Sequence, residues 1–181
     1  MNKIGLFYGS DTGNTETVVQ KIIDLIGEEF FDQHDMATVN EIEKFAEYEH
    51  IILGVPTWYD GELQSDWDYF FEKFKTIDFT GKKVAIFGLG DQYGYGEWFV
   101  DGIGILGNEV MQNGGELVGA WPAADYHFHE SVALFEHEGE TYFMGLALDE
   151  DNESELTDQR LQEWLTDIFE EFDIELEEKA N

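Results

Sequence analysis

Cysteine is absent from this sequence, and basic residues are scarce. Without cysteine, the chain has no disulfide, no thiol nucleophile and no cysteine-ligated metal cluster. Only 9 lysine and arginine residues accompany 41 aspartate and glutamate residues, so the formal charge is -32. Such a surface repels nucleic acids and anionic membranes, and it attracts partner proteins with basic docking faces. The same charge also keeps a protein soluble, particularly at high salt, and both interpretations remain open.

Long hydrophobic runs are lacking as well. No apolar stretch approaches the ~20 residues that span a bilayer, and the chain begins with a short apolar run after Lys3 instead of a signal peptide. We therefore expect a cytoplasmic protein. Hydrophobic residues nevertheless make up 43% of the chain and aromatic residues 15%, more than a disordered chain would carry. The length of 181 residues predicts a single domain spanning residues 1–181.

Short apolar runs alternate with stretches of helical periodicity along the chain. The runs predict buried strands at residues 3–8, 36–39, 51–55 (ending at Pro56), 84–87 and 117–120. Apolar residues at helical spacing predict helices at residues 18–26, 63–74, 99–110 and 161–172, the last with Thr157 as its N-cap. This alternation predicts an α/β fold with a parallel sheet and helices on both faces. Ligands of such sheets bind beyond the carboxyl ends of the strands.

Residues 121–143 do not follow this alternation. Their apolar pattern is weak, so we expect a long loop that interrupts the fifth strand, which resumes near residues 142–146. His127, His129 and His137 in this stretch are residues that zinc can use as ligands. No cysteine assists them, and surface histidines are the preferred interpretation.

The loop after the first strand, residues 9–15, also opens a helix. Backbone N–H groups at a helix N-terminus favour anions, and Gly13 allows a close backbone approach. A triphosphate-binding loop would need a lysine where Asn14 stands. Hydroxyl and amide donors without a cation therefore predict a monophosphate, although an ordinary polar turn would look similar. These donors belong to Ser10, Thr12, Asn14 and Thr15.

Two further loops carry aromatic residues and glycine. Trp58 and Tyr59 follow the third strand, and Tyr95 ends a glycine-rich loop, residues 88–95, after the fourth strand. Rings from the two loops could cover both faces of a flat ligand. Alternatively, Trp58 packs on the core and the tyrosines lie on the surface. The shared position of all three loops at the carboxyl ends of strands favours a site for FMN.

These motifs resemble the flavodoxin family, and its long-chain branch in particular. Residues 10–15 are similar to the family's phosphate loop, and residues 56–58 with 61–67 to its second flavin loop and the following helix. Residues 88–95 resemble its third loop, and residues 145–152 a segment of long-chain members. The similarity extends over essentially the whole chain.

The resemblance implies a flavodoxin-like three-layer sandwich with a five-stranded parallel sheet in the order 2-1-3-4-5. It implies a low-potential one-electron carrier, not an enzyme, with non-covalently bound FMN shuttling between semiquinone and hydroquinone. The implied partners are redox proteins, among them a donor like ferredoxin-NADP reductase, and the expected state is a monomer. The insertion at residues 121–143 resembles a proposed partner-recognition element.

The resemblance also assigns roles to residues. The loop at 10–15 would hold the phosphate, Trp58 and Tyr95 would flank the flavin, and Asp151 would lie near the ribityl chain. The Tyr59–Asp60 peptide is where family members flip a carbonyl on reduction, and two residues bulkier than glycine make such a flip costlier. The implied cofactor-binding residues are Ser10, Asp11, Thr12, Gly13, Asn14, Thr15, Thr57, Trp58, Tyr59, Asp60, Gly61, Leu89, Gly90, Asp91, Tyr95, Trp98 and Asp151.

Two other functions compete with this one. An FMN-dependent NAD(P)H:quinone reductase would need space for a nicotinamide on one flavin face, and a phosphate clamp for which the chain offers one arginine, Arg160. A flavin-free acidic binding module is the second alternative, because a fold alone does not determine a function.

Overall fold

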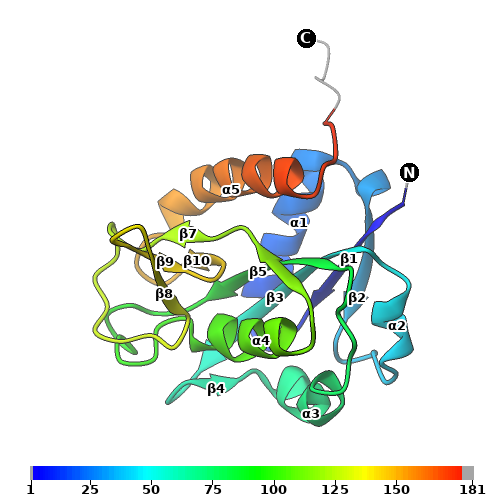
Figure 1. Ribbon diagram of the computed structural model, residues 1–181. Coiled ribbons are helices and arrows are strands. Elements are labelled where there is room, and N and C mark those ends of the chain that lie inside the picture. Colours follow the sequence, from blue (N-terminus) through cyan, green and yellow to red (C-terminus); the bar gives the residue numbers. More distant parts are fainter. Residues whose placement is uncertain (1, 177–181) are drawn as a thin grey trace.

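The computed structural model describes residues 2–176, which place a parallel β-sheet between two layers of helices (Figure 1). The main strands pair in the order β10-β5-β3-β1-β2, and every pair along this path is parallel. This is the predicted order, with β5 and β10 in the fourth and fifth places. The strands are β1 (Ile4–Tyr8), β2 (Phe31–Asp35), β3 (His50–Trp58), β5 (Lys83–Leu89) and β10 (Leu146–Leu148).

The central strands form where the sequence is continuously apolar, because both faces of the sheet are covered. Strand β3 nevertheless continues through Pro56 to Trp58, so the prediction that it ends at Pro56 is wrong. Beyond Gly54, β3 no longer pairs with β1. A proline has no backbone N–H group to donate. It is tolerated there because one side of the strand no longer pairs with a neighbouring strand, so the missing donor costs little. A short antiparallel strand, β4 (Glu62–Leu63), pairs with the end of β3.

The second strand was predicted in the wrong place. It covers Phe31–Asp35 and not residues 36–39. As an edge strand it has one neighbour, β1, and only Phe31 of its side chains is buried. Met36 and Val39 are buried too, but in the loop that follows the strand. These two residues are apolar because they contact the core. The sequence of β2 itself is mostly polar, so its strand pattern was weaker than the apolar pattern of the loop that follows it.

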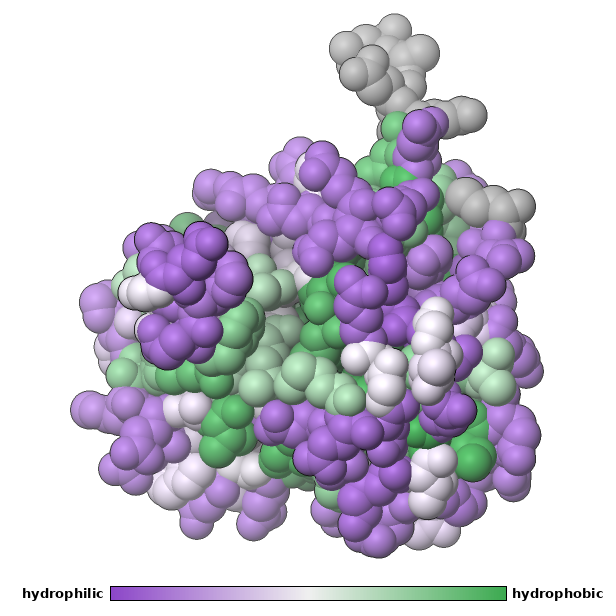
Figure 2. Space-filling view, viewed as in Figure 1, coloured by the Kyte–Doolittle hydropathy of each residue, from purple (hydrophilic) through white to green (hydrophobic). Residues whose placement is uncertain are grey.

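Helices cover both faces of the sheet. Helices α1 (Asn14–Ile26) and α5 (Thr157–Glu171) pack on one face, where Ile22 and Trp164 join one apolar core. Helices α2 (Glu43–Ala46), α3 (Ser65–Phe74) and α4 (Asp101–Gln112) pack on the other, where Phe74 and Ile103 join a second core. The outward side of α5 is hydrophilic (Figure 2). Short 3-10 turns lie at Glu28–Phe30 and Ser154–Leu156.

Helix starts differ from the predictions. Thr157 is the first residue of α5 and not its N-cap, because its backbone is already helical, with φ −59° and ψ −46°. Its hydroxyl hydrogen-bonds to the Glu150 carboxylate instead of to the helix backbone. Leu63 belongs to β4, and Phe99 precedes α4. Both residues pack on the same core as the helices that follow them. Apolar spacing alone therefore extended these helices too far towards the N-terminus.

The fifth strand position is interrupted, as predicted. Strand β6 (Glu116–Val118) pairs with the first part of β5, and β10 pairs with the last part. The insertion between them is not a loop, however, because it forms a three-stranded antiparallel sheet in the order β7-β9-β8. Tyr142, expected in the resumed strand, lies in this small sheet. Its strands are β7 (Trp121–Pro122), β8 (Leu134–His137) and β9 (Glu140–Phe143).

Two further properties concern the described residues only. Within residues 2–176, no group of three or more histidine, cysteine, aspartate or glutamate side chains is arranged to hold a metal ion. No described helix combines the length and apolarity that a membrane crossing requires.

Candidate functional site

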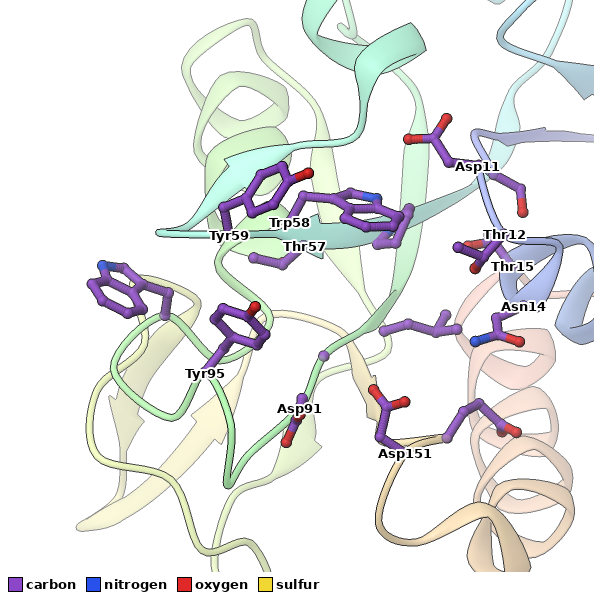
Figure 3. A pocket seen from close by; sticks show the side chains of 16 residues that line it. Asp11, Thr12, Asn14, Thr15, Thr57, Trp58, Tyr59, Asp91, Tyr95 and Asp151 are labelled. Carbon is purple, nitrogen blue, oxygen red and sulfur yellow. The ribbon is translucent and has the colours of Figure 1, made fainter.

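A cavity of about 260 Å³ lies beyond the carboxyl ends of β1, β3, β5 and β10 (Figure 3). This is the edge where ligands of open parallel sheets bind. Loops from four separate parts of the chain meet there. The residues around it are Ser10, Asp11, Thr12, Asn14, Thr15, Pro56, Thr57, Trp58, Tyr59, Leu89, Gly90, Asp91, Tyr95, Trp98, Glu150 and Asp151.

Most of the predicted site residues line this cavity. Gly13, Asp60 and Gly61 do not, although each lies in a loop that contributes other lining residues. Pro56 and Glu150 line it and were not predicted. Pro56 was assigned to the second flavin loop and to the end of a strand, but not to the cofactor-binding residues. Glu150 precedes the predicted Asp151 directly, so the carboxyl end of the fifth strand was the signal that could have identified it.

One end of the cavity is formed by the start of α1. Gly13 precedes the helix with φ 89°, a left-handed conformation that favours glycine, and its N–H donates to Ser10 Oγ at 3.1 Å. The first N–H groups of a helix lack intrahelical acceptors and attract anions. Thr12, Asn14 and Thr15 lie at this same end (Figure 3). This end of the cavity can therefore bind an anion through neutral donors.

The Asp11 carboxylate is directed away from this anion-binding end (Figure 3). Its Oδ1 accepts hydrogen bonds from Gln64 Nε2 at 2.8 Å and from Ser65 Oγ at 3.0 Å. Both donors lie at the N-terminus of α3, where a negative charge is stabilised. The hydrogen bonds thus reduce the repulsion that Asp11 would exert on a bound anion.

Trp58 and Tyr95 reach the cavity from different segments of the chain (Figure 3). Trp58 is the last residue of β3, and Tyr95 follows β5 with 46% of its surface exposed. The Trp58 indole Nε1 is buried and has no hydrogen-bond partner within residues 2–176. An unpaired buried donor costs free energy, so this nitrogen favours a ligand that brings an acceptor. The two rings suit a ligand with a flat aromatic part.

The loop that follows Trp58 has an unusual backbone. Tyr59 adopts φ 44° although it is not glycine, and Gly61 adopts φ 80°. Left-handed conformations cost a residue with a side chain about 1–2 kcal/mol. A Cβ at Gly61 would also lie 2.6 Å from Asp101 Oδ2, so that position is restricted to glycine. Strain of this kind often accumulates at functional sites.

The cavity is electrostatically negative. Asp11, Asp91, Glu150 and Asp151 line it, and no lysine or arginine within residues 2–176 does. Burial raises the pKa of Asp151 above its ordinary value, and the nearby carboxylates of Asp91, Asp149 and Glu150 raise it further. Burial also opposes ionisation of Asp91, but hydrogen bonds from the Gly94 N–H and from Asn152 hold its pKa below its ordinary value. Any anion bound in this cavity therefore meets electrostatic repulsion from these carboxylates.

Known proteins resemble this chain over nearly its whole length. The flavodoxin family model matches residues 6–164. A flavodoxin from Klebsiella pneumoniae is 44% identical over 172 residues, which cover 95% of this chain and 96% of the relative. A flavodoxin from Synechocystis sp. is 47% identical over 169 residues, which cover 93% and 96%.

A solved structure shows the same likeness in three dimensions. The crystal structure of Fusobacterium nucleatum flavodoxin bound to flavin mononucleotide matches with a TM-score of 0.86 and 35% identity. The match covers 94% of this chain and 99% of that chain. Together with the family match and the curated relatives, this likeness shows that the chain belongs to the flavodoxin family.

Proposed function

We propose that this chain is an electron carrier that holds one FMN non-covalently in the cavity at the carboxyl end of its sheet. The observation that carries the proposal is the combination of the α1 N-terminus and the unpaired Trp58 Nε1 around one cavity. Figure 3 shows the indole nitrogen of Trp58 on the side of its ring that faces the Thr12 loop. A phosphate oxygen or a ribityl hydroxyl would supply the acceptor that this nitrogen lacks.

The proposed roles follow the cavity walls. Residues 10–15 bind the phosphate through backbone N–H and hydroxyl groups. Trp58 and Tyr95 cover the flavin ring, and backbone groups of Tyr59, Leu89 and neighbouring residues contact its polar edge. Asp60 and Gly61 contribute by shaping the loop, since neither lines the cavity. Gly13 contributes through its left-handed turn.

Bound FMN supplies the one-electron redox chemistry, and the protein determines its energy. The aromatic side chains exclude water from the ring faces, and the surrounding carboxylates oppose added negative charge. Both effects lower the potential of the couple between the half-reduced and the fully reduced flavin. We therefore propose that this low-potential couple is the working one.

A carrier is favoured over a quinone reductase by the position of Arg160. This residue is the one arginine in the sequence, and it is only 8% exposed. Its Nη2 pairs with Glu153 Oε2 at 2.9 Å, and its guanidinium stacks on Tyr126 at 4.4 Å. It does not line the cavity, so it does not offer a phosphate clamp for a nicotinamide dinucleotide there.

The remaining proposals concern the working context. We propose a monomeric, single-domain, cytoplasmic member of the long-chain branch, whose partners are redox proteins with basic docking faces. The charge of -32 suits a donor like ferredoxin-NADP reductase with a basic docking face, because oppositely charged proteins meet faster. Association rates with such a donor should fall steeply as salt is added.

The test is a visible absorption spectrum of the purified protein during stepwise anaerobic reduction. Flavin bands that pass through a long-wavelength, half-reduced form would support a one-electron carrier. Bleaching directly to the fully reduced form, or rapid reduction by NAD(P)H without a reductase, would favour the reductase. A protein without flavin bands that also ignores added FMN would be the flavin-free binding module.

A further inference from the structure

Asp149 is a fully buried carboxylate beside the cavity, and it does not line it. It follows the last residue of β10, Leu148, and precedes the lining residues Glu150 and Asp151. Among the described residues, no lysine, arginine or histidine forms an ion pair with it. A buried charge is costly unless hydrogen bonds compensate it, so its neutral partners reveal what it does.

These partners come from two loops of the cavity wall. Asp149 Oδ2 accepts from the Gln92 backbone N–H at 3.2 Å and from Gln92 Nε2 at 2.9 Å. Asp149 Oδ1 accepts from the Asn152 backbone N–H at 3.0 Å, and Asn152 Nδ2 lies within 3.1 Å of both oxygens. A carboxylate accepts about four hydrogen bonds, and here they are divided between the loop after β5 and the loop after β10.

The same network continues to the cavity wall and to the insertion. Asn152 Nδ2 also contacts Asp91 Oδ1 at 2.8 Å, and Asp91 lines the cavity next to Asp151 (Figure 3). The buried Gln92 accepts a hydrogen bond from the His127 backbone N–H at 2.6 Å through its Oε1. Three segments far apart in the sequence are thus joined through one carboxylate and two amide side chains.

We propose that Asp149 is a positioning residue, which holds the loop carrying Asp91 and Tyr95 against the loop carrying Glu150 and Asp151. The proposal rests on the FMN site proposed above. Gln92 extends this arrangement to the insertion, so the backbone at His127 is coupled to the same wall of the cavity. Asp149 acts through these loops and through its charge, without touching the cofactor.

The experiment compares Asp149→Asn with Asp125→Asn. Asp125 is exposed in the insertion, two residues before His127, so the control removes the same charge without a buried network. Asparagine at 149 presents an amide N–H₂ group where one carboxylate oxygen accepted, which leaves at least one donor unpaired. We expect the dissociation constant of FMN, measured by fluorescence quenching, to rise tenfold to 100-fold, because FMN must then bind between loops that have lost a hydrogen bond to a charged group.

The two midpoint potentials of the FMN-loaded variants give a second readout, which a purely structural role would not move. In Asp149→Asn the potential of the second electron should become less negative than in Asp125→Asn, because a buried charge near the cavity is poorly screened. Equal FMN affinities and equal potentials in the two variants would overturn the proposal. If the wild-type protein binds no FMN at all, the proposed function fails instead.

A second variant covers the case in which Asp149→Asn does not fold. Gln92→Met keeps the size of the side chain but removes its hydrogen bonds to Asp149 and to the His127 backbone. We expect weaker FMN binding, with the wild-type circular dichroism spectrum retained. Wild-type FMN affinity in a folded Gln92→Met protein would contradict the proposed positioning role.

Discussion

Salt should strengthen the binding of FMN to this protein, in contrast to the usual behaviour of phosphate sites. Sites that use lysine or arginine lose affinity as salt is added, because the attraction is screened. Here Asp11, Asp91, Glu150 and Asp151 line the cavity, and no basic residue in the described part of the chain does. In the proposed site the phosphate would therefore bind through neutral donors while these carboxylates repel it.

The magnitude follows from Coulomb's law. A phosphate of about −2 charge that lies about 10 Å from one carboxylate is repelled by about 0.8 kcal/mol in water. The 4 lining carboxylates together contribute at most about 3 kcal/mol before screening, and Asp11 contributes less than the others because it is directed away and hydrogen-bonded to Gln64 and Ser65. The screening length falls from about 30 Å at 0.01 M salt to about 3 Å at 1 M. Most of the repulsion then disappears, so the affinity should rise by about 2 kcal/mol, or about thirtyfold.

The assay is a fluorescence titration of the FMN-free protein at several sodium chloride concentrations, with riboflavin as the matched ligand. Riboflavin lacks the phosphate, so its affinity reports the effect of salt on the flavin ring and on protein compactness alone. The ratio of FMN affinity to riboflavin affinity should rise with salt. A ratio that falls would show that a cation, and not neutral donors, dominates the phosphate end of the cavity.

Three further predictions test other parts of the site and fold. Trp58→Phe keeps a ring but loses the unpaired indole N–H, so FMN affinity measured by titration should fall about tenfold. The unfolding free energy of the FMN-free protein should not change. Equal FMN affinities of the variant and the wild type would refute the proposed bond. Tyr59→Gly relieves the left-handed strain at φ 44° and should raise the unfolding free energy by about 1 kcal/mol in urea, whereas Tyr59→Ala should not. Burial lowers the pKa of His34 below its ordinary value of 6.5, so its contribution to stability is present above that value and is lost as pH falls. The advantage of the wild type over His34→Gln in thermal unfolding should therefore shrink between about pH 7.5 and about pH 5.5, and a constant difference would contradict this.

The sequence predicted the fold best where burial is complete. The apolar runs that became β1, β3 and β5 are unambiguous because both faces of these strands are covered. The edge strand β2 was misplaced because only one of its side chains is buried, while the loop after it holds the buried Met36. The insertion was taken for a loop because β7 has two residues, and β8 and β9 have four each. Segments this short show no clear hydrophobic periodicity.

The candidate site was predictable because it depends on topology more than on single residues. Loops that follow parallel strands meet at one edge of the sheet, and this rule was sufficient to bring Trp58, Tyr95 and the start of α1 together. That argument could place Asp149 at the carboxyl end of the fifth strand, but it could not show that Asp149 is buried. The sequence around Asp149 is rich in acidic residues and resembles an exposed loop. Only the contacts of Asp149 with Gln92 and Asn152 in the structure show that it is buried.

The divided fifth strand has a consequence for association between molecules. An uninterrupted edge strand offers a row of unpaired backbone groups to which a second molecule can add a strand. Here the edge beyond β5 is split between β6 and β10, each three residues long, with the insertion sheet between them. The opposite edge, β2, carries Asp32 and Asp35. An interrupted edge and a charged edge together make strand exchange and fibril growth unfavourable.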